Sequence, residues 1–156
     1  MEKIAKFEKV SFTQFSEDWR KSFPECEADK IKEIYENIKL PVRATAGSAG
    51  YDFFLPESIE LSAGEGMLIP TGIRAKIADG WVLNIYPRSG LGFKFRLQLD
   101  NTVGIIDADY YNAANEGHIM VKVTNDGRGG KVLSLERGKG FAQGVFLPFG
   151  ITVDDE

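Results

Sequence analysis

The segment from His118 to Thr124 reads HIMVKVT, and its side chains alternate between two faces. Ile119, Val121 and Val123 fall on one face, because successive side chains of a strand point to opposite sides of a sheet. Similar short apolar segments lie on both sides of this one, from Ala44 onward, divided by Gly, Pro, Asn and Asp. Ten such segments without a long helix between them predict a mainly β domain, a sandwich or barrel of mostly antiparallel sheet. The predicted strands are Tyr51–Leu55, Ile59–Leu61, Met67–Pro70, Ile73–Ile77, Trp81–Tyr86, Phe95–Asp100, Val103–Ile106, His118–Thr124, Val132–Leu135 and Phe141–Pro148.

The first forty residues follow a different pattern. A short strand is predicted within Lys3–Val10, and Ser11–Gln14 has the form of a capping box, in which the Ser hydroxyl and the Gln side chain satisfy free amides at a helix start. Apolar residues at spacings of three and four predict a helix after this box and a second one over Glu27–Lys39, which Pro41 ends. We therefore expect a helical extension over residues 1–40 and one β domain over residues 41–156.

Composition excludes several classes of partner and of site. The 156 residues carry a formal net charge of −4, which disfavours duplex nucleic acid and anionic membranes as partners. A single cysteine, Cys26, and a single histidine, His118, exclude an internal disulfide and a multi-histidine metal site, and they disfavour a Ser-His-Asp triad. The sequence contains no apolar run of the length of a membrane span and no signal peptide at its start, so the cytoplasm is the expected location.

Two glycine-rich segments have side chains suited to phosphate. Ala46–Asp52 reads AGSAGYD, in which small residues permit close approach of the backbone, although a plain glycine-rich turn fits equally well. Pro87–Gly92 reads PRSGLG and directly follows a predicted strand. Its Arg, its hydroxyl and its glycines suit an oxyanion, and the alternative is a turn at a helix start with a solvated Arg.

Two further segments place single polar residues among apolar ones. In Leu99–Tyr110, Asn101 and Thr102 are predicted to turn a hairpin whose return strand ends at Asp107. This carboxylate is a candidate base, and the alternative is an Asp that caps a turn. In Arg137–Pro148, Gln143 is the one polar side chain of an apolar strand, either a structural group or a ligand contact.

Taken in this order, the four segments resemble the conserved motifs of the trimeric dUTP pyrophosphatases (dUTPases). Those motifs read approximately Ala-Gly-Ser-Ala-Gly-x-Asp, Pro-Arg-Ser-Gly-Leu, Gly-x-Ile-Asp-x-x-Tyr and Arg-x-x-Gln. Their counterparts here are Ala46–Asp52, Pro87–Leu91, Gly104–Tyr110 and, more loosely, Lys139–Gln143. The resemblance covers residues 40 to 150, and the helical start is similar to the extension of some bacterial and phage members.

The resemblance implies a jelly-roll-like β domain in a homotrimer with active sites between subunits. It implies hydrolysis of dUTP to dUMP and pyrophosphate, by attack of water at the α-phosphorus, with Mg²⁺ held largely by the triphosphate. By position, Asp107 matches the carboxylate that orients and deprotonates the water, and Tyr110 matches the aromatic residue that stacks on deoxyribose. The other implied substrate contacts are Arg88, Ser89, Gly90 and Gln143 for phosphate and Asn101, Gly104 and Ile106 for uracil. Asp52 is a candidate for the water shell of the metal or for trimer structure, and no direct metal ligand is expected.

The sequence departs from the family at two places. The loop from Tyr111 to Gly117 is longer than usual, and the glycine-rich closing arm with its Phe does not follow Pro148 within the 156 residues. Since such lids exclude water and position phosphates, we expect the fold and nucleotide binding to be retained and turnover to be reduced. The alternatives are a non-catalytic trimer that acts as a nucleotide sensor or protein-binding module and, less favoured, a dCTP deaminase. The deaminase would need a Glu where Lys122 stands.

Overall fold

A computed structural model describes residues 1–156, without the side chain of Arg128. The strands are β1 (Ala5–Lys9), β2 (Val42–Arg43), β3 (Tyr51–Phe54), β4 (Ile59–Leu61), β5 (Gly66–Pro70), β6 (Ile73–Ile77), β7 (Trp81–Pro87), β8 (Leu97–Leu99), β9 (Gly104–Ile106), β10 (Met120–Asn125), β11 (Leu133–Leu135) and β12 (Gly140–Pro148). The helices are α1 (Phe12–Ser22), α2 (Ala28–Glu36) and α3 (Ser89–Phe95), with short 3₁₀ turns η1 (Ala108–Asn112) and η2 (Arg128–Gly130).

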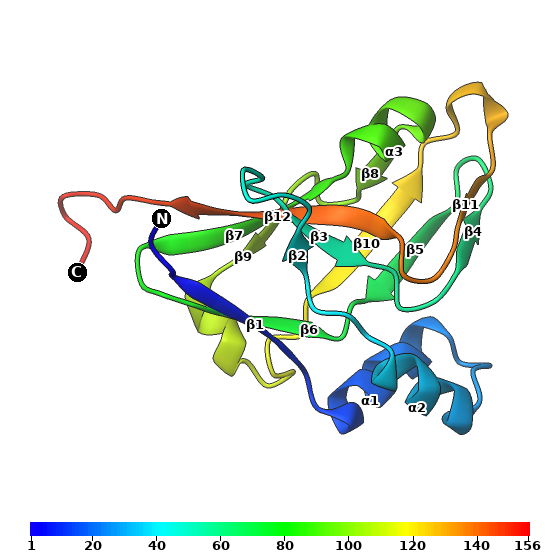
Figure 1. Ribbon diagram of the computed structural model, residues 1–156, viewed down its shortest axis with the longest axis horizontal. Helices are drawn as coiled ribbons and strands as arrows, with labels where there is room; N and C mark the ends of the chain where they lie inside the picture. The colour runs from blue at the N-terminus through cyan, green and yellow to red at the C-terminus, as the bar shows by residue number, and fades with distance from the viewer.

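The strands form antiparallel sheets of unequal size. The largest has the order β2-β3-β12-β7-β9, a second has the order β5-β10-β8, and two pairs join β1 to β6 and β11 to β4. In Figure 1 the helices α1 and α2 lie together beside the strands, and the chain after β12 extends away from the rest of the molecule. The mainly β architecture is therefore as the alternating pattern predicts.

The long strand β12 lies at the middle of the largest sheet. It pairs with β3 on one side and β7 on the other, and Gly144 stands opposite Ile85. A Cβ atom at Gly144 would lie 2.9 Å from atoms of both Leu83 and Phe53, so the close packing of this layer requires glycine. β12 thereby fixes the relative positions of two segments with predicted phosphate contacts.

One apolar core joins the N-terminal helices to the β domain. Phe15, Trp19 and Ile34 of the helices belong to the same buried cluster as Phe53 and Leu83 of the sheets. Burial of this kind stabilises a helix by covering its apolar stripe. The division of the chain near residue 40 stays a prediction, since the helices and strands share this core.

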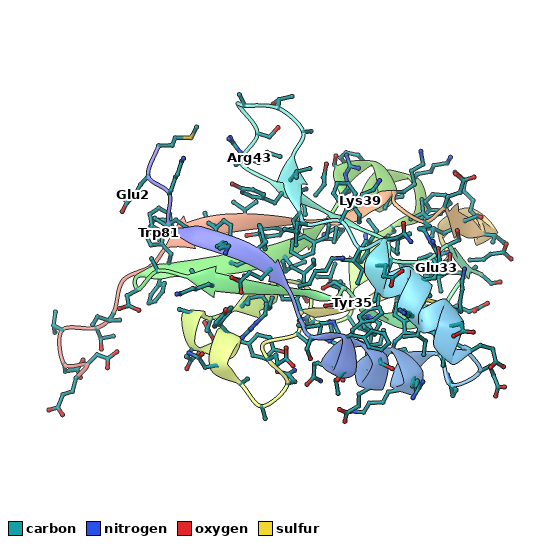
Figure 2. All side chains as sticks on the ribbon, turned by 60° about the horizontal axis from the view of Figure 1, so that its bottom comes forward. Glu2, Glu33, Tyr35, Lys39, Arg43 and Trp81 are labelled. Atoms are coloured by element: carbon teal, nitrogen blue, oxygen red, sulfur yellow. The ribbon has the colours of Figure 1, made fainter. Side chains whose placement is uncertain are left out.

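Polar contacts also anchor the helices. Figure 2 shows Glu33 and Tyr35 on α2. The Tyr35 hydroxyl donates to the carbonyl of Val10 at 2.7 Å, and the Glu33 carboxylate pairs with the Arg137 guanidinium. This ion pair lowers the pKa of Glu33 to about 2, mainly through the hydrogen bond from Arg137. Helix α2 is thus tied to the turn that precedes β12.

The predicted capping box forms only in part. The Ser11 hydroxyl accepts from the amide of Gln14 at 3.1 Å, as predicted. The Gln14 side chain, however, donates to Asp18 at 2.9 Å, and the amide of Ser11 donates to Glu116 at 2.8 Å. A carboxylate from a distant loop therefore replaces the local partner.

Three details differ from the expected secondary structure. Ser89–Phe95 is the helix α3, so the strand predicted from Phe95 begins only at Leu97. The predicted hairpin is wrong, because β8 pairs with β10 while β9 pairs with β7, and the turn at Asn101 joins two sheets. His118 precedes β10 and is fully buried, although the alternation placed it opposite the buried face. None of the helices among the described residues is long and apolar enough to cross a membrane.

Candidate active site

Residues of the first, second and fourth sequence segments line one hollow, called here the Arg88 hollow. Its lining residues are Ala44, Ser48, Ala49, Gly50, Asp52, Arg88, Ser89, Gln143 and Val145. Its volume of about 420 Å³ falls within the roughly 300–1,000 Å³ of small-molecule sites. The structure therefore brings together Asp52, Arg88, Ser89 and Gln143, which lie as much as 91 positions apart (143 − 52) in the chain.

Strand register explains how these side chains meet. Asp52 on β3 stands opposite Gln143 on β12, and Arg88 directly follows β7, the other neighbour of β12. The Arg88 Nε atom lies 3.4 Å from Asp52 Oδ1, with the Arg side chain 45% exposed and the Asp side chain 18% exposed. The carboxylate orients the guanidinium and leaves much of it open to a ligand, because Arg has five N–H donors.

Gln143 is half-buried and has one protein partner in this hollow. Its Nε2 atom donates to the carbonyl of Pro87 at 3.3 Å. A Cβ atom at Gly50 would lie 2.6 Å from its Oε1 atom, so the first segment packs against this side chain. Both readings of Gln143 fit these contacts, since it links two strands and also lines the hollow.

The remaining predicted phosphate contact, Gly90, lines a second hollow that shares Arg88 and Ser89 with the first. Ser89, Gly90, Lys139 and Gly140 line an adjoining hollow that also includes Arg88. Lys139 was not among the predicted contacts, although its place beside Gly140 in the fourth segment offered a signal. The two adjoining hollows give an anion access to Arg, Lys and hydroxyl donors together.

Arg43 holds the loop of the first segment. Its Nη1 atom donates to the carbonyls of Ala46 and Ser48 at 2.6 and 3.1 Å. The hydroxyls of Thr45 and Ser48 lie 2.8 Å apart. Figure 2 shows Arg43 beside this loop, which projects from the strands. Sequence reasoning missed Arg43, since nothing in its neighbourhood distinguishes it from a solvated cation.

Asp107 lies in a different hollow, called here the Asp107 hollow. Its lining residues are Lys76, Ile77, Asp79, Asp107, Ala108, Asp109, Tyr111, Asn112 and Phe149. Asp107 is exposed, ends the segment after β9 and precedes the turn η1, whose Tyr110 amide donates to its carbonyl at 3.2 Å. The carboxylate is therefore free to contact a water molecule or a ligand, and its position also fits the start of a turn.

Tyr110 is held by its hydroxyl group. That hydroxyl donates to the carbonyl of His118 at 2.7 Å and accepts from the Asn115 amide at 2.8 Å. The next residue, Tyr111, donates its hydroxyl to Glu8 at 2.6 Å, and the Arg74 guanidinium lies 3.6 Å from its ring centre. The hydrogen bond from Tyr111 is the main cause that lowers the pKa of Glu8. Residues of the same loop therefore hold Tyr110, whereas side chains far away in the sequence hold Tyr111.

The predicted uracil contacts lie around the turn between β8 and β9. Asn101 is exposed, and Thr102 adopts a φ of 70° while its amide donates to the carbonyl of Leu99 at 2.9 Å. Gly104 and Ile106 stand opposite Ile85 and Leu83 of β7. The turn is tight, as predicted, but its two arms do not pair with one another.

The two groups of predicted residues stay apart within one chain. In Figure 1, α3, which follows Arg88, lies above the central strands, and the yellow-green turn η1 after Asp107 lies below them. The described lining residues of the Arg88 hollow and the Asp107 hollow do not overlap. Each hollow thus contains only some of the predicted site residues.

The described side chains form no cluster of three or more His, Cys, Asp or Glu residues that could hold a metal ion. Asp52 is a single carboxylate and is paired with Arg88. Mg²⁺ in phosphate-transfer sites is commonly bound by one or two carboxylates together with substrate phosphates and water. The donors present therefore fit an ion that arrives with a triphosphate better than one held by the protein alone.

The antiparallel β domain places Arg, Ser, Gln and glycines at one strand end and an exposed carboxylate at another. These groups are the ones that a nucleotide hydrolase needs to bind phosphate and to activate water. The chain belongs to the dUTPase family, whose model matches residues 36–154. The resemblance predicted from the four segments is thereby confirmed.

Similar proteins from bacteria agree with this assignment. The chain is 42% identical over 125 residues to the deoxyuridine 5′-triphosphate nucleotidohydrolase of Lactococcus lactis, covering 78% of this chain and 82% of the relative. It is 47% identical over 118 residues to that of Pectobacterium carotovorum, covering 74% and 73%. The crystal structure of dUTPase from Streptococcus mutans superimposes with a TM-score of 0.68 at 37% identity, covering 94% of this chain and 97% of that one. A dUTPase from Staphylococcus aureus phage phi11 has the same TM-score at 21% identity, covering 99% and 96%, and so shares the fold.

Proposed function

We propose that this chain hydrolyses dUTP to dUMP and pyrophosphate in active sites shared between the subunits of a homotrimer. The observation that carries this proposal is the separation of the Arg88 hollow from the Asp107 hollow within one chain. A reaction that needs both groups requires a second subunit, and rotational symmetry repeats the same contact in every subunit.

Exposed apolar side chains support assembly. Leu147, Phe149 and Ile151 are 38%, 52% and 71% exposed, and they lie at and beyond the end of β12. Adjacent apolar residues of this kind mark contact surfaces in soluble proteins. Because Phe149 also lines the Asp107 hollow, a neighbouring subunit docked here would cover that hollow.

On the phosphate side, Arg88 is the main cation. We assign Arg88, Ser89, Gly90 and Gln143 to the triphosphate, with Asp52 holding the guanidinium in place. Fixed donors of this kind stabilise negative charge that develops on phosphoryl oxygens, since they need no reorganisation during the reaction.

On the other side, Asp107 acts on the water. Its carboxylate accepts a proton as the water oxygen bonds to the α-phosphorus and the bond from that phosphorus to the bridging oxygen breaks, which releases pyrophosphate. A positioned base of this type contributes about 10²–10⁴-fold to the rate. Because Asp107 is exposed in the single chain, there is room beside it for a triphosphate bound in a site that a neighbouring subunit completes.

The nucleoside is assigned to the turn before β9 and to Tyr110. Asn101 and backbone groups at Gly104 and Ile106 are placed to read uracil, because a tight turn offers amides and carbonyls in fixed directions. The ring of Tyr110 is assigned to the deoxyribose, where it leaves no room for a 2′-hydroxyl.

Mg²⁺ arriving with the triphosphate would neutralise phosphate charge and orient the phosphoryl oxygens. In this chain, Asp52 is the residue placed to contact the ion's water shell, beside Arg88. The cytoplasmic location stays a prediction. Reduced turnover of residues 1–156 also stays a prediction. It is tested by comparing the rate of dUTP hydrolysis of this chain with that of a version that carries an appended glycine-rich arm.

Hydrolysis in water enriched in ¹⁸O tests the proposal. Attack at the α-phosphorus predicts ¹⁸O in dUMP and none in pyrophosphate. Asp107→Asn is expected to lower the rate by about 10²–10⁴-fold while dUTP still binds. No hydrolysis and no nucleotide binding by the parent chain would favour the non-catalytic trimer, and release of ammonia from dCTP would favour a deaminase.

A further inference from the structure

The loop that follows Tyr110 is held by the N-terminal segment between Glu8 and Asp18. The Tyr111 hydroxyl donates to Glu8 at 2.6 Å, and the amide and hydroxyl of Ser11 donate to the Glu116 carboxylate at 2.8 and 2.6 Å. At the end of the loop, His118 Nδ1 lies 2.6 Å from Asp18 Oδ2. Four polar contacts thus join three pairs of residues that are about 100 positions apart in the sequence.

The contact of Asp18 with His118 is the most buried of the three. His118 is 0% exposed and Asp18 is 5% exposed. The amide of Gly72 donates to His118 Nε2 at 2.8 Å, so Nε2 is the acceptor and the ring proton sits on Nδ1, facing Asp18. Burial is the main cause that lowers the pKa of His118, which keeps the imidazole neutral between its two partners.

The hydrogen bonds on Asp18 favour its charged form. Burial acts to raise the pKa of Asp18, but hydrogen bonds from Gln14 and His118 outweigh it, and the pKa is lowered. The carboxylate is therefore a fixed acceptor for the His118 N–H. A charge-assisted hydrogen bond in a buried setting holds its partner more firmly than a neutral one does.

His118 in turn restrains Tyr110 through its main-chain carbonyl. The carbonyl of His118 accepts the Tyr110 hydroxyl at 2.7 Å. Asn115 donates to the same hydroxyl at 2.8 Å and accepts from the Gly117 amide at 3.1 Å. The position of the Tyr110 ring thus depends on the path of the loop up to His118.

We propose that the N-terminal segment positions Tyr110 for sugar selection, with Asp18 as the principal positioning residue through His118 and Ser11 as a second one through Glu116. This inference rests on the proposed function, in which Tyr110 contacts the deoxyribose. Rejection of a 2′-hydroxyl needs an aromatic ring held to about 0.5 Å, since a looser ring can move aside. The helical extension therefore acts on substrate choice as well as on stability.

The test compares kcat/KM for dUTP and UTP in variants of the full chain. Asp18→Ala removes the acceptor of the His118 N–H, and the ratio of the two values is expected to fall about 10- to 100-fold, as misplacement by about 1 Å can cost 10²-fold. Asp18→Asn keeps an oxygen acceptor and is expected to retain most of the selectivity. Glu17→Ala is the matched control, because Glu17 directly precedes Asp18 on α1, is 62% exposed and is paired with Lys21.

A second variant covers the case in which Asp18→Ala does not fold. Glu116→Ala removes the exposed contact with Ser11 and is expected to lower the dUTP/UTP ratio by a smaller factor, without loss of fold by circular dichroism. An unchanged ratio in folded Asp18→Ala, or in Glu116→Ala if the former does not fold, would overturn the inference. If the parent chain does not hydrolyse dUTP, the proposed function is overturned and the inference with it. That result is distinguishable from failure of the inference alone, in which the parent chain hydrolyses dUTP and the variants keep its dUTP/UTP ratio.

Discussion

Replacing Gly117 by Ala tests the geometry of the loop that carries Tyr110. Gly117 adopts a φ of 71°, and a Cβ atom there would lie 2.6 Å from the carbonyl oxygen of Tyr110 and 2.8 Å from the Cα of Tyr111. Both are backbone atoms, so neither can move aside by a change of rotamer. The loop must shift or the chain must accept the strain.

The magnitude follows from two contributions. A residue with a Cβ in the left-handed region costs roughly 1–2 kcal/mol, and an added methyl in a packed place costs about 1–3 kcal/mol. We expect Gly117→Ala to lower the free energy of unfolding by about 2–5 kcal/mol. At about 2–4 °C per kcal/mol for a chain of this size, Tm falls by roughly 4–20 °C.

The control is Gly80→Ala, which separates the two contributions. Gly80 has a φ of 81°, and no described atom lies within 4 Å of its Cβ position. Calorimetry of both variants should show a loss of about 1–2 kcal/mol at Gly80, from conformation alone. Since the clash falls on Tyr110, kcat/KM for dUTP should fall in Gly117→Ala and stay unchanged in Gly80→Ala. Equal losses of stability in the two variants would refute the steric reasoning.

Three further predictions concern stability. Burial lowers the pKa of His118 below its ordinary 6.5, so the unfolded chain binds a proton that the folded chain does not. The urea midpoint should therefore fall as the pH drops below about 6.5, and a His118→Gln variant that keeps the same slope there would contradict this. The pKa of Glu33 is lowered from 4.5 to about 2 in the folded chain, so the free energy of unfolding should decrease as the pH falls from 4.5 to about 2. Arg137→Gln should make this decrease smaller in acid titrations followed by circular dichroism. Leu83→Ala, at a fully buried position, should cost about 2–5 kcal/mol in denaturant titrations; a cost under about 1 kcal/mol would mean that the site collapses around the smaller side chain.

The alternating patterns predicted much of the β domain. Ile59–Leu61 and Ile73–Ile77 form strands with the predicted bounds, because their alternation and the turn residues around them are local signals. The helix over Ser89–Phe95 follows the alternative for Pro87–Gly92, a turn at a helix start, and its length was not predicted. Gly90 and Gly92 lower helix propensity, and the two Phe residues favour a strand.

Local sequence patterns predicted the residue types of the site, whereas only the family resemblance predicted that the site is shared between subunits. The residue types at Arg88 and Asp107 indicated phosphate chemistry, and the family resemblance joined them into one reaction. Their placement in separate hollows depends on sheet order, which local patterns do not encode. The contact between Asp18 and His118 was likewise invisible, because it joins residues 100 positions apart and α1 was interpreted by its apolar face.

Mixing two inactive variants tests most directly whether Arg88 and Asp107 act in one site from different subunits. Arg88→Ala and Asp107→Asn are each purified, shown by light scattering to have the parent's assembly state, unfolded together in equal amounts and refolded. Random assembly gives about one quarter of the shared sites both native groups, so the mixture should recover about a quarter of the parent's pyrophosphate release from dUTP. A mixture no more active than the two variants refolded separately would contradict the shared site.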